Sequence, residues 1–195
     1  HYPLRRQRQM CIRDRIKKSH RVHGVILDGG KAANIIPDYT HARFYTRATT
    51  RKELDILTER VNQIARGAAI QTGCDYEFGP IQNGVNEFIK TPKLDELFEK
   101  YAIEVGEEVS YDDFGFGSTD TGNVSHIVPT IHPHVKIGSR NLVGHTHRFR
   151  EAAASVHGDQ ALIRGAKIIA LMGLELIENK KLFDEVVEQH SQIKG

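Results

Sequence analysis

The stretch from Phe116 to Phe149 restricts the fold of this chain more than any other segment. Its two prolines and four glycines interrupt both the helical and the strand period, so we expect mostly loops and short strands there. Polar loops held by a rigid scaffold commonly carry binding and catalytic residues. The stretch is therefore the candidate active centre, and it contains five histidines: His126, His132, His134, His145 and His147.

The residues alone leave three interpretations of these histidines open. Neutral imidazoles in a cluster can ligate zinc or a similar ion. Single histidines can instead act as general bases or oxyanion donors, or each can be a half-exposed loop residue with one hydrogen bond. The segments 132–134 and 145–147 place alternate imidazoles on one side of an extended chain, but the sequence contains neither Cys-x-x-Cys nor His-Glu-x-x-His. The spacing alone is therefore only a weak indication of a metal site.

The composition narrows the class of protein. The chain has 195 residues, enough for one large domain or parts of two, and its net charge of +2 is too small and too evenly spread to indicate nucleic-acid binding. Its two cysteines, Cys11 and Cys74, offer neither a disulfide framework nor a paired-cysteine metal site. The longest apolar runs, such as residues 168–174, are far shorter than a membrane span. We expect a cytoplasmic protein that binds neither nucleic acid nor a membrane.

The sequence of the first 15 residues suggests that they do not come from the same gene as the rest of the chain. Residues 8–14 match a translated reading frame of a common transposase-based sequencing adaptor. We therefore interpret residues 1–15 as translated adaptor, not native sequence, and expect them to be no part of the fold.

The next part of the chain has the pattern of an α+β sandwich. Alternation of side chains predicts strands over residues 21–27 and 38–48, and a third strand over 75–81. The capping box Thr50–Glu53 and a stop at Gly73 bound a predicted helix over residues 51–71. We expect the helix to lie on an antiparallel sheet, with a buried stripe formed by Leu54, Leu57, Val61 and Ile64.

The rest of the chain is predicted to be the closing portion of an α/β domain. Thr91 and Pro92 open a helix, with a hydroxyl cap and proline at the first position. Asp159 is the predicted cap of a long apolar helix, and a short helix follows Asn179.

Several separated motifs in this order resemble one family. They are Gly24, the segment Asp28–Asp38, Arg47, the segment Gly117–Asp120, and Gly144 with His145. Together they resemble the M20 family of metallopeptidases and amidohydrolases, and within it the branch of aminobenzoyl-glutamate hydrolases and related amidohydrolases.

The resemblance implies a fold class that is α/β and α+β. It implies a zinc-peptidase-like α/β catalytic domain that holds two divalent ions, zinc or manganese, and an inserted α+β, ferredoxin-like lid through which the protein forms a homodimer. On this basis residues 16–84 are a partial lid without its first strand and helix. Residues 85–195 are the C-terminal part of the catalytic domain.

The resemblance also assigns roles to residues. His145 is similar to the last metal ligand of the family. Asn34, Arg47 and His23 match lid positions that reach toward the substrate. The loop that lines the substrate pocket is matched by Gly117, Ser118, Thr119 and Asp120. The side chains of Asn34 and Arg47 suit these roles. An amide can donate a hydrogen bond to a developing oxyanion, and the planar guanidinium group can bind a carboxylate through two hydrogen bonds.

Each assignment has a structural alternative. Asn34 can instead stabilise the Gly29-Gly30 turn, Arg47 can be a solvated strand residue, and Asp120 can serve a cap or a turn. For His132, His134 and His147 we expect no metal role.

The remaining family ligands and the general-base glutamate have no match in this sequence. We therefore expect a C-terminal fragment, cut within the lid and inactive alone, of a metal-dependent amidohydrolase or peptidase. Its substrate would be a small acyl-amino acid, a dipeptide or an aminobenzoyl-glutamate-like compound. The alternative is a non-catalytic module for dimerisation or ligand binding.

Overall fold

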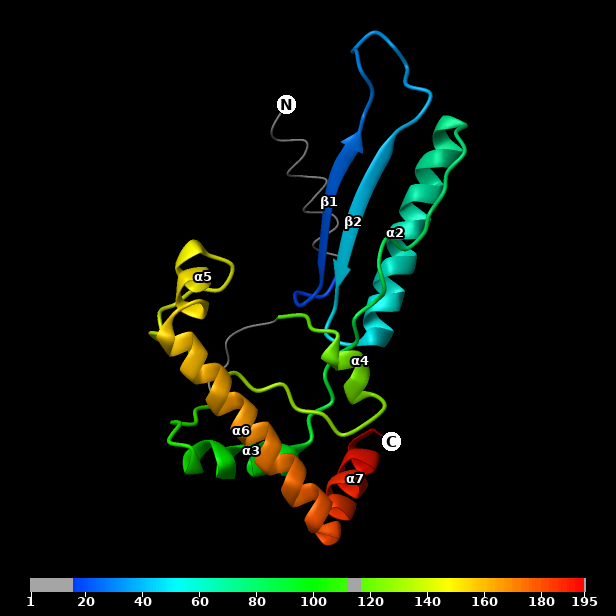
Figure 1. Ribbon diagram of the computed structural model, residues 1–195. Helices are drawn as coiled ribbons and strands as arrows, with labels where there is room; N and C mark the ends of the chain where they lie inside the picture. The colour runs from blue at the N-terminus through cyan, green and yellow to red at the C-terminus, as the bar shows by residue number, and fades with distance from the viewer. Residues whose placement is uncertain (1–15, 112–116, 195) are drawn as a thin grey trace. The chain divides into compact units, whose positions relative to one another are not determined.

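The part of the chain that the structure describes combines helices with a two-stranded sheet. The computed structural model describes residues 16–111 and 117–194. They form two compact units, the first ending at Glu87 and the second beginning at Phe88, and each is described by itself (Figure 1). The mixed α and β composition of the predicted fold class is confirmed. The roles predicted for residues 16–84 and 85–195 stay predictions, and the proposed adaptor lies outside the described residues.

An antiparallel two-stranded ribbon forms the sheet of the first unit. Strand β1 (Arg21–Asp28) pairs with β2 (His41–Arg47), and Arg21 lies opposite Arg47. Both predicted strands are confirmed, although β2 begins at His41 and not at Asp38.

Helix α2 (Arg51–Thr72) begins and ends where the sequence predicts. The Thr50 hydroxyl accepts a hydrogen bond from the backbone N–H of Glu53 at 3.3 Å, as an N-cap does. Gly73 ends the helix in the left-handed region, with φ of 68°, which glycine adopts without steric cost.

The buried stripe of α2 is shorter than predicted. Leu57 is 3% exposed and Leu54 and Val61 are half-buried, but Ile64 is 55% exposed. The 22 residues of α2 span about 33 Å, whereas the seven residues of β2 span about 23 Å. The later turns of α2 therefore run beyond the strands and have less sheet to cover.

The predicted third strand over residues 75–81 is wrong. The structure has no strand there, so the described part of the first unit holds two strands. Gly79 and Pro80 interrupt the segment, because proline has no N–H for a ladder and glycine weakens strand pairing. The described residues of the first unit thus form two strands and one helix, and the ferredoxin-like lid stays a prediction.

The second unit is helical in its described part. It contains α3 (Pro92–Glu104), α4 (Thr121–Ser125), α5 (His147–Ala153), α6 (Val156–Glu178) and α7 (Lys180–Lys194). Helix α6 packs against α3, α5 and α7. The core joins α3 to α6 through Leu97, Ala102, Ile168 and Met172.

Residues 117–149, for which the sequence predicts loops and short strands, contain helices and loops instead. Helices α4 and α5 are the only regular elements within residues 117–149, and the rest of that range is loop and turn. The short strands predicted there are therefore wrong, whereas the predicted loops are present.

The start of α3 differs from the predicted hydroxyl cap. Pro92 lies in the first turn as predicted, but the Thr91 side chain makes no capping bond. Thr91 is fully buried, and its hydroxyl has no hydrogen-bond partner among the described residues. Gln189 of α7 accepts from the backbone N–H of Lys93 at 2.9 Å instead. The cap comes from a residue distant in sequence, which a local pattern cannot reveal.

Helix α6 begins earlier than predicted. The Ser155 hydroxyl accepts from the backbone N–H of Gly158 at 3.3 Å, so the helix starts at Val156. Asp159 lies in the first turn, where its negative charge suits the helix dipole. Although α6 is long and rich in apolar residues, neither it nor any other helix in the described residues could cross a membrane.

Candidate functional site

The predicted site residues are divided between the two units. His23, Asn34 and Arg47 belong to the first unit, whereas Gly117–Asp120 and His145 belong to the second.

His23 and Arg47 lie on the same face of the ribbon. His23 is paired with Tyr45, and Arg47 is paired with Arg21. Paired residues share a face, and so do residues two apart on one strand. Arg43 therefore lies on this face too, and all five side chains are exposed. We call Arg21, His23, Arg43, Tyr45 and Arg47 the cationic face.

Helix α2 covers the opposite face of the ribbon. The hydroxyls of Thr46 on β2 and Thr58 on α2 are 2.9 Å apart. Thr46 lies between Tyr45 and Arg47 on β2, so its side chain is on the other face of the ribbon. Helix α2 therefore does not cover the cationic face. Guanidinium groups on an open face can bind a carboxylate through paired hydrogen bonds.

Asn34 lies in the exposed loop between β1 and β2. At the start of this loop the backbone N–H of Gly30 donates to the Asp28 carboxylate at 3.1 Å, and Gly30 has φ of 97°. Asp28 therefore stabilises the Gly29-Gly30 turn, which was the structural role considered for Asn34. The exposed Asn34 amide is left available to a ligand.

The Gly117–Asp120 loop leads directly into α4. The hydroxyls of Thr119 and Thr121 are 2.8 Å apart, and the backbone N–H of Gly122 donates to the Thr119 carbonyl at 3.0 Å. Asp120 occupies the N-cap position, yet its exposed side chain makes no capping hydrogen bond. The capping alternative for Asp120 is therefore not supported by the structure.

A buried polar cluster anchors α4. His190 of α7, which is 4% exposed, places its Nε2 2.6 Å from the Ser125 carbonyl oxygen. The Ser125 hydroxyl accepts from the backbone N–H of Ile89 at 2.9 Å and donates to the Gly122 carbonyl at 2.6 Å. Buried polar groups are costly when unpaired, so these bonds fix α4 and with it the end of the preceding loop.

Sequence reasoning does not identify His190 or Ser125. One signal was available, because His190 follows Val186 by one helical turn and shares the stripe of Leu182. A histidine on an apolar stripe needs a hydrogen-bond partner once it is buried. The partner itself could not be predicted, since Ser125 is distant in sequence.

His145 has a strained backbone. Its φ is 60°, which makes it the one non-glycine residue in the left-handed region among those described. It is exposed and precedes α5, whose cap is the Thr146 hydroxyl accepting from Phe149 N–H at 3.2 Å. Residues held in this region concentrate at functional sites.

The described residues do not complete a metal site. Across residues 16–111 and 117–194, no three His, Cys, Asp or Glu side chains are grouped so as to hold an ion. The rings of His132 and His134 have centroids 5.5 Å apart, and His147 begins α5. Zinc sites in proteins use at least three protein ligands. His145 with these residues alone therefore does not fit a metal centre.

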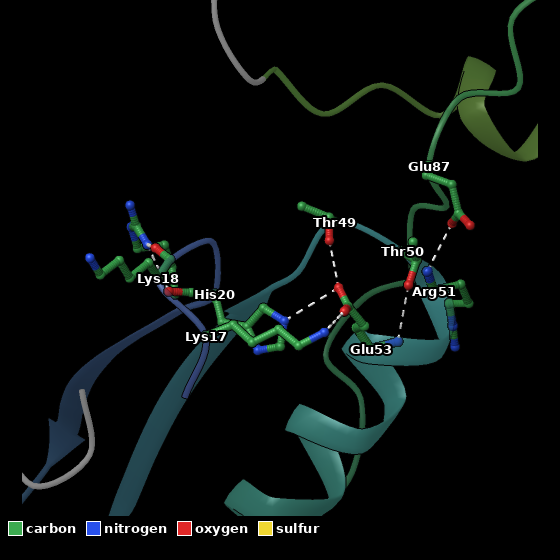
Figure 2. A network of polar contacts seen from close by, with 9 residues as sticks. Lys17, Lys18, His20, Thr49, Thr50, Arg51, Glu53 and Glu87 are labelled. Carbon is green, nitrogen blue, oxygen red and sulfur yellow. Dashed lines mark hydrogen bonds and ion pairs between the residues drawn. The ribbon is translucent and has the colours of Figure 1, made fainter. Parts of the chain in front are cut away.

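Glu53 is the ionic centre of the first unit. Lys17 and Thr49 donate to its carboxylate, and His20 Nε2 lies 3.4 Å from it (Figure 2). The hydrogen bond from Lys17, and next that from Thr49, lower the pKa of Glu53 to about 2. The predicted capping box has this carboxylate reach back to Thr50, whereas the structure places it in a cluster that ties the segment before β1 to α2.

Comparison with known proteins gives the chain two similar relatives. No family model matches it. It is 36% identical to the Xaa-Arg dipeptidase of Homo sapiens over 184 residues, which cover 91% of the chain and 41% of the dipeptidase. It is 35% identical to the Xaa-Arg dipeptidase of Mus musculus over 179 residues, covering 90% of the chain and 41% of the relative. The chain thus spans about two fifths of the length of these relatives. The chain is therefore similar to a part of each of these two dipeptidases.

Proposed function

We propose that this chain is part of a metal-dependent amidohydrolase or peptidase of the M20 type. Its substrate would be a dipeptide, a small acyl-amino acid or an aminobenzoyl-glutamate-like compound. The observation that carries the proposal is the 36% identity to the human Xaa-Arg dipeptidase across 91% of the chain. In this proposal the chain is inactive without the rest of the hydrolase.

The chain's own residues have binding and positioning roles in this proposal. Arg47, on the cationic face with His23, receives the substrate carboxylate in its planar fork. The Asn34 amide donates to the carbonyl oxygen on which negative charge develops. The loop from Gly117 to Asp120, anchored through α4, lines the substrate pocket.

Two divalent ions per intact subunit, zinc or manganese, belong to the proposal, with His145 as one ligand. The ions would supply Lewis-acid polarisation of the amide. The remaining ligands would come from residues outside this chain. Both imidazoles are exposed, and the left-handed backbone of His145 supports its selection over His147, which begins α5.

A cytoplasmic homodimer formed through the first unit is also proposed. In the described part of the chain β1 pairs with β2 alone, so each strand has one unpaired edge. Unpaired edges are templates for pairing with another chain.

A non-catalytic module for dimerisation or ligand binding is the second candidate. The observation that favours it is the absence, within the described residues, of any three grouped metal ligands. The two candidates differ in whether the longer polypeptide that contains this chain has catalytic activity.

The test measures hydrolysis by that longer polypeptide on dipeptides, acyl-amino acids and aminobenzoyl-glutamate, with and without a chelator. We expect chelator-sensitive turnover of at least one class, and none by the 195-residue chain. Arg47→Lys should raise KM because lysine lacks the planar fork, while Arg66→Lys, at an exposed position on α2, should not. A longer polypeptide without hydrolytic activity would favour the binding module.

A further inference from the structure

The cationic face carries charge of one sign. It contains three arginines and a histidine, all of them exposed. Asp28, at the end of β1, is the one acidic residue in the two strands, and its carboxylate accepts from the backbone N–H of Gly30 at 3.1 Å. The whole chain is nearly balanced, with 27 lysine and arginine residues against 25 aspartate and glutamate residues. The excess of positive charge on this face is therefore local.

The three arginines differ in the contacts that they make. Arg21 donates to the backbone carbonyl oxygen of His20 at 2.8 Å and also to that of Lys18. Within residues 16–111 and 117–194, neither Arg43 nor Arg47 has a hydrogen-bond or ion-pair partner. Two planar guanidinium groups on this face are therefore free to bind an anion through paired hydrogen bonds.

The arrangement of these charges lowers the stability of the ribbon. Arg21 lies directly opposite Arg47, and like charges in such a pair are destabilising. Elsewhere in the first unit an arginine has an acidic partner, since Arg51 pairs with Asp55 at 2.8 Å. Departures of this kind from what stability favours are expected at functional sites. An anion bound at the arginines of the cationic face would offset their repulsion.

We propose that Arg43 binds a second negative charge on the substrate, so that the amino acid released by hydrolysis is acidic. The inference rests on the proposed function, in which Arg47 receives the substrate carboxylate. One carboxylate occupies one guanidinium fork and leaves Arg43 without a partner. A glutamate or aspartate residue at the end of the substrate supplies the second carboxylate. Arg43 acts in binding and specificity and takes no part in the chemical step.

The register of the ribbon fits this assignment. Arg43 and Arg47 lie on one side of β2 with Cα atoms about 14 Å apart, at about 3.4 Å per residue. Their long side chains allow the two guanidinium groups to approach one ligand from both ends. Val25, which is paired with Arg43, is 54% exposed and offers an apolar surface beside it. The methylene groups of an acidic side chain can contact Val25 while the carboxylate reaches Arg43.

The same charges select against other residues at the end of the substrate. The ammonium or guanidinium group of a lysine or arginine residue would be repelled by Arg43 and Arg47. A glutamine side chain has the shape of glutamate without the charge. Specificity of this kind combines an attractive contact with a repulsive one. Because the cationic face is exposed, added salt should weaken the preference.

The test compares substrates that differ only in the charge of the released residue. Hydrolysis by the longer polypeptide is measured on N-acetyl amino acids and on alanyl dipeptides that end in glutamate, glutamine or lysine. We expect kcat/KM to be about tenfold higher for glutamate than for glutamine, the size of effect that a hydrogen bond to a charged group provides. The value for lysine should be lower still.

Variants assign the preference to Arg43. Arg43→Gln should lower kcat/KM about tenfold on glutamate substrates, through KM, because a charged hydrogen bond is lost. It should leave glutamine substrates unchanged, which also shows that the variant is folded. Arg43→Lys keeps the charge without the planar fork and should retain part of the preference. Arg66→Gln removes the same charge at an exposed position on α2 and is the matched control, with no change expected on either substrate.

Two results would overturn the inference and leave the hydrolase in place. The first is hydrolysis with equal kcat/KM for glutamate and glutamine substrates, or with a higher value for lysine. The second is an equal loss on glutamate and glutamine substrates in Arg43→Gln, because Arg43 would then not distinguish the charge.

A longer polypeptide that hydrolyses none of these substrates would contradict the proposed function, and equilibrium binding then decides the inference. Calorimetry measures the affinity of that polypeptide for N-acetylglutamate and for N-acetylglutamine. Binding of N-acetylglutamate that is about tenfold tighter, with the difference lost in Arg43→Gln, would support the site for a second charge. Equal affinities would overturn it.

Discussion

The two units of the chain are stabilised in different ways. Among the described residues of the first unit, Leu57 is the one buried hydrophobic side chain. That unit relies on the β ladder, on helix caps and on the ionic cluster at Glu53. The second unit has an apolar core in which Ile168 is completely buried. The second unit should therefore respond to changes in side-chain volume, whereas the first should respond more to pH and salt.

The largest expected effect is a cavity in the core of the second unit. Ile168→Ala should lower the free energy of unfolding by about 2–5 kcal/mol, because the side chain is 0% exposed. Ile169→Ala, at its 69% exposed neighbour, is the control and should change it by less than about 0.5 kcal/mol in this chain. Denaturant unfolding measures both, and equal losses would contradict the described core.

The first unit should lose less from the same kind of change. Leu57→Ala should cost about 2 kcal/mol, near the lower end of the range, because its neighbours Leu54 and Val61 are only half-buried and the site can relax. Ile56→Ala, at a residue 65% exposed, is the matched control. If Leu57→Ala cost as much as Ile168→Ala, the contrast between the units would be wrong.

The polar cluster of the second unit gives a smaller and more local effect. His190→Leu should cost about 1–3 kcal/mol by leaving the buried Ser125 carbonyl without a donor. It should also speed hydrogen exchange in α4. His190→Gln keeps a donor in reach and should restore part of the loss. Unchanged exchange in α4 after His190→Leu would mean that this bond does not hold the helix.

The smallest predicted effect is the acid sensitivity of the first unit. The pKa of Glu53 is lowered from 4.5 to about 2 in the folded protein, first by Lys17 and next by Thr49. A depressed folded-state pKa gives stability that is present above the ordinary value and is lost as pH falls from about 4.5 toward 2. Glu53→Gln should remove this part of the pH dependence, and added salt should weaken it. Thermal unfolding as a function of pH measures it, and the same acid profile in Glu53→Gln would contradict the assignment.

Local signals in the sequence predict the elements of the first unit well. The alternation in β1 and β2, the Thr50 cap and the Gly73 stop act within a few residues, so they can be read without tertiary information. The predicted strand over residues 75–81 fails because the pattern does not show whether a pairing partner exists. The predicted Thr91 cap fails because Gln189, from another helix, replaces it.

The candidate site could be predicted only in part. The motifs select His145, Asn34 and Arg47, and the ribbon register places Arg47 with His23 on one open face. The bond between His190 and Ser125 depends on the packing of α7, which no local pattern contains. The described residues group no two further possible ligands with His145, so its metal role stays a prediction.

Metal content tests the proposed hydrolase most directly. The longer polypeptide should contain two ions of zinc or manganese per subunit. Its His145→Ala variant should lose one of them, while His147→Ala should keep both, and the 195-residue chain should bind zinc only weakly. Full metal content in His145→Ala, or two tightly bound ions in the chain alone, would contradict the proposal.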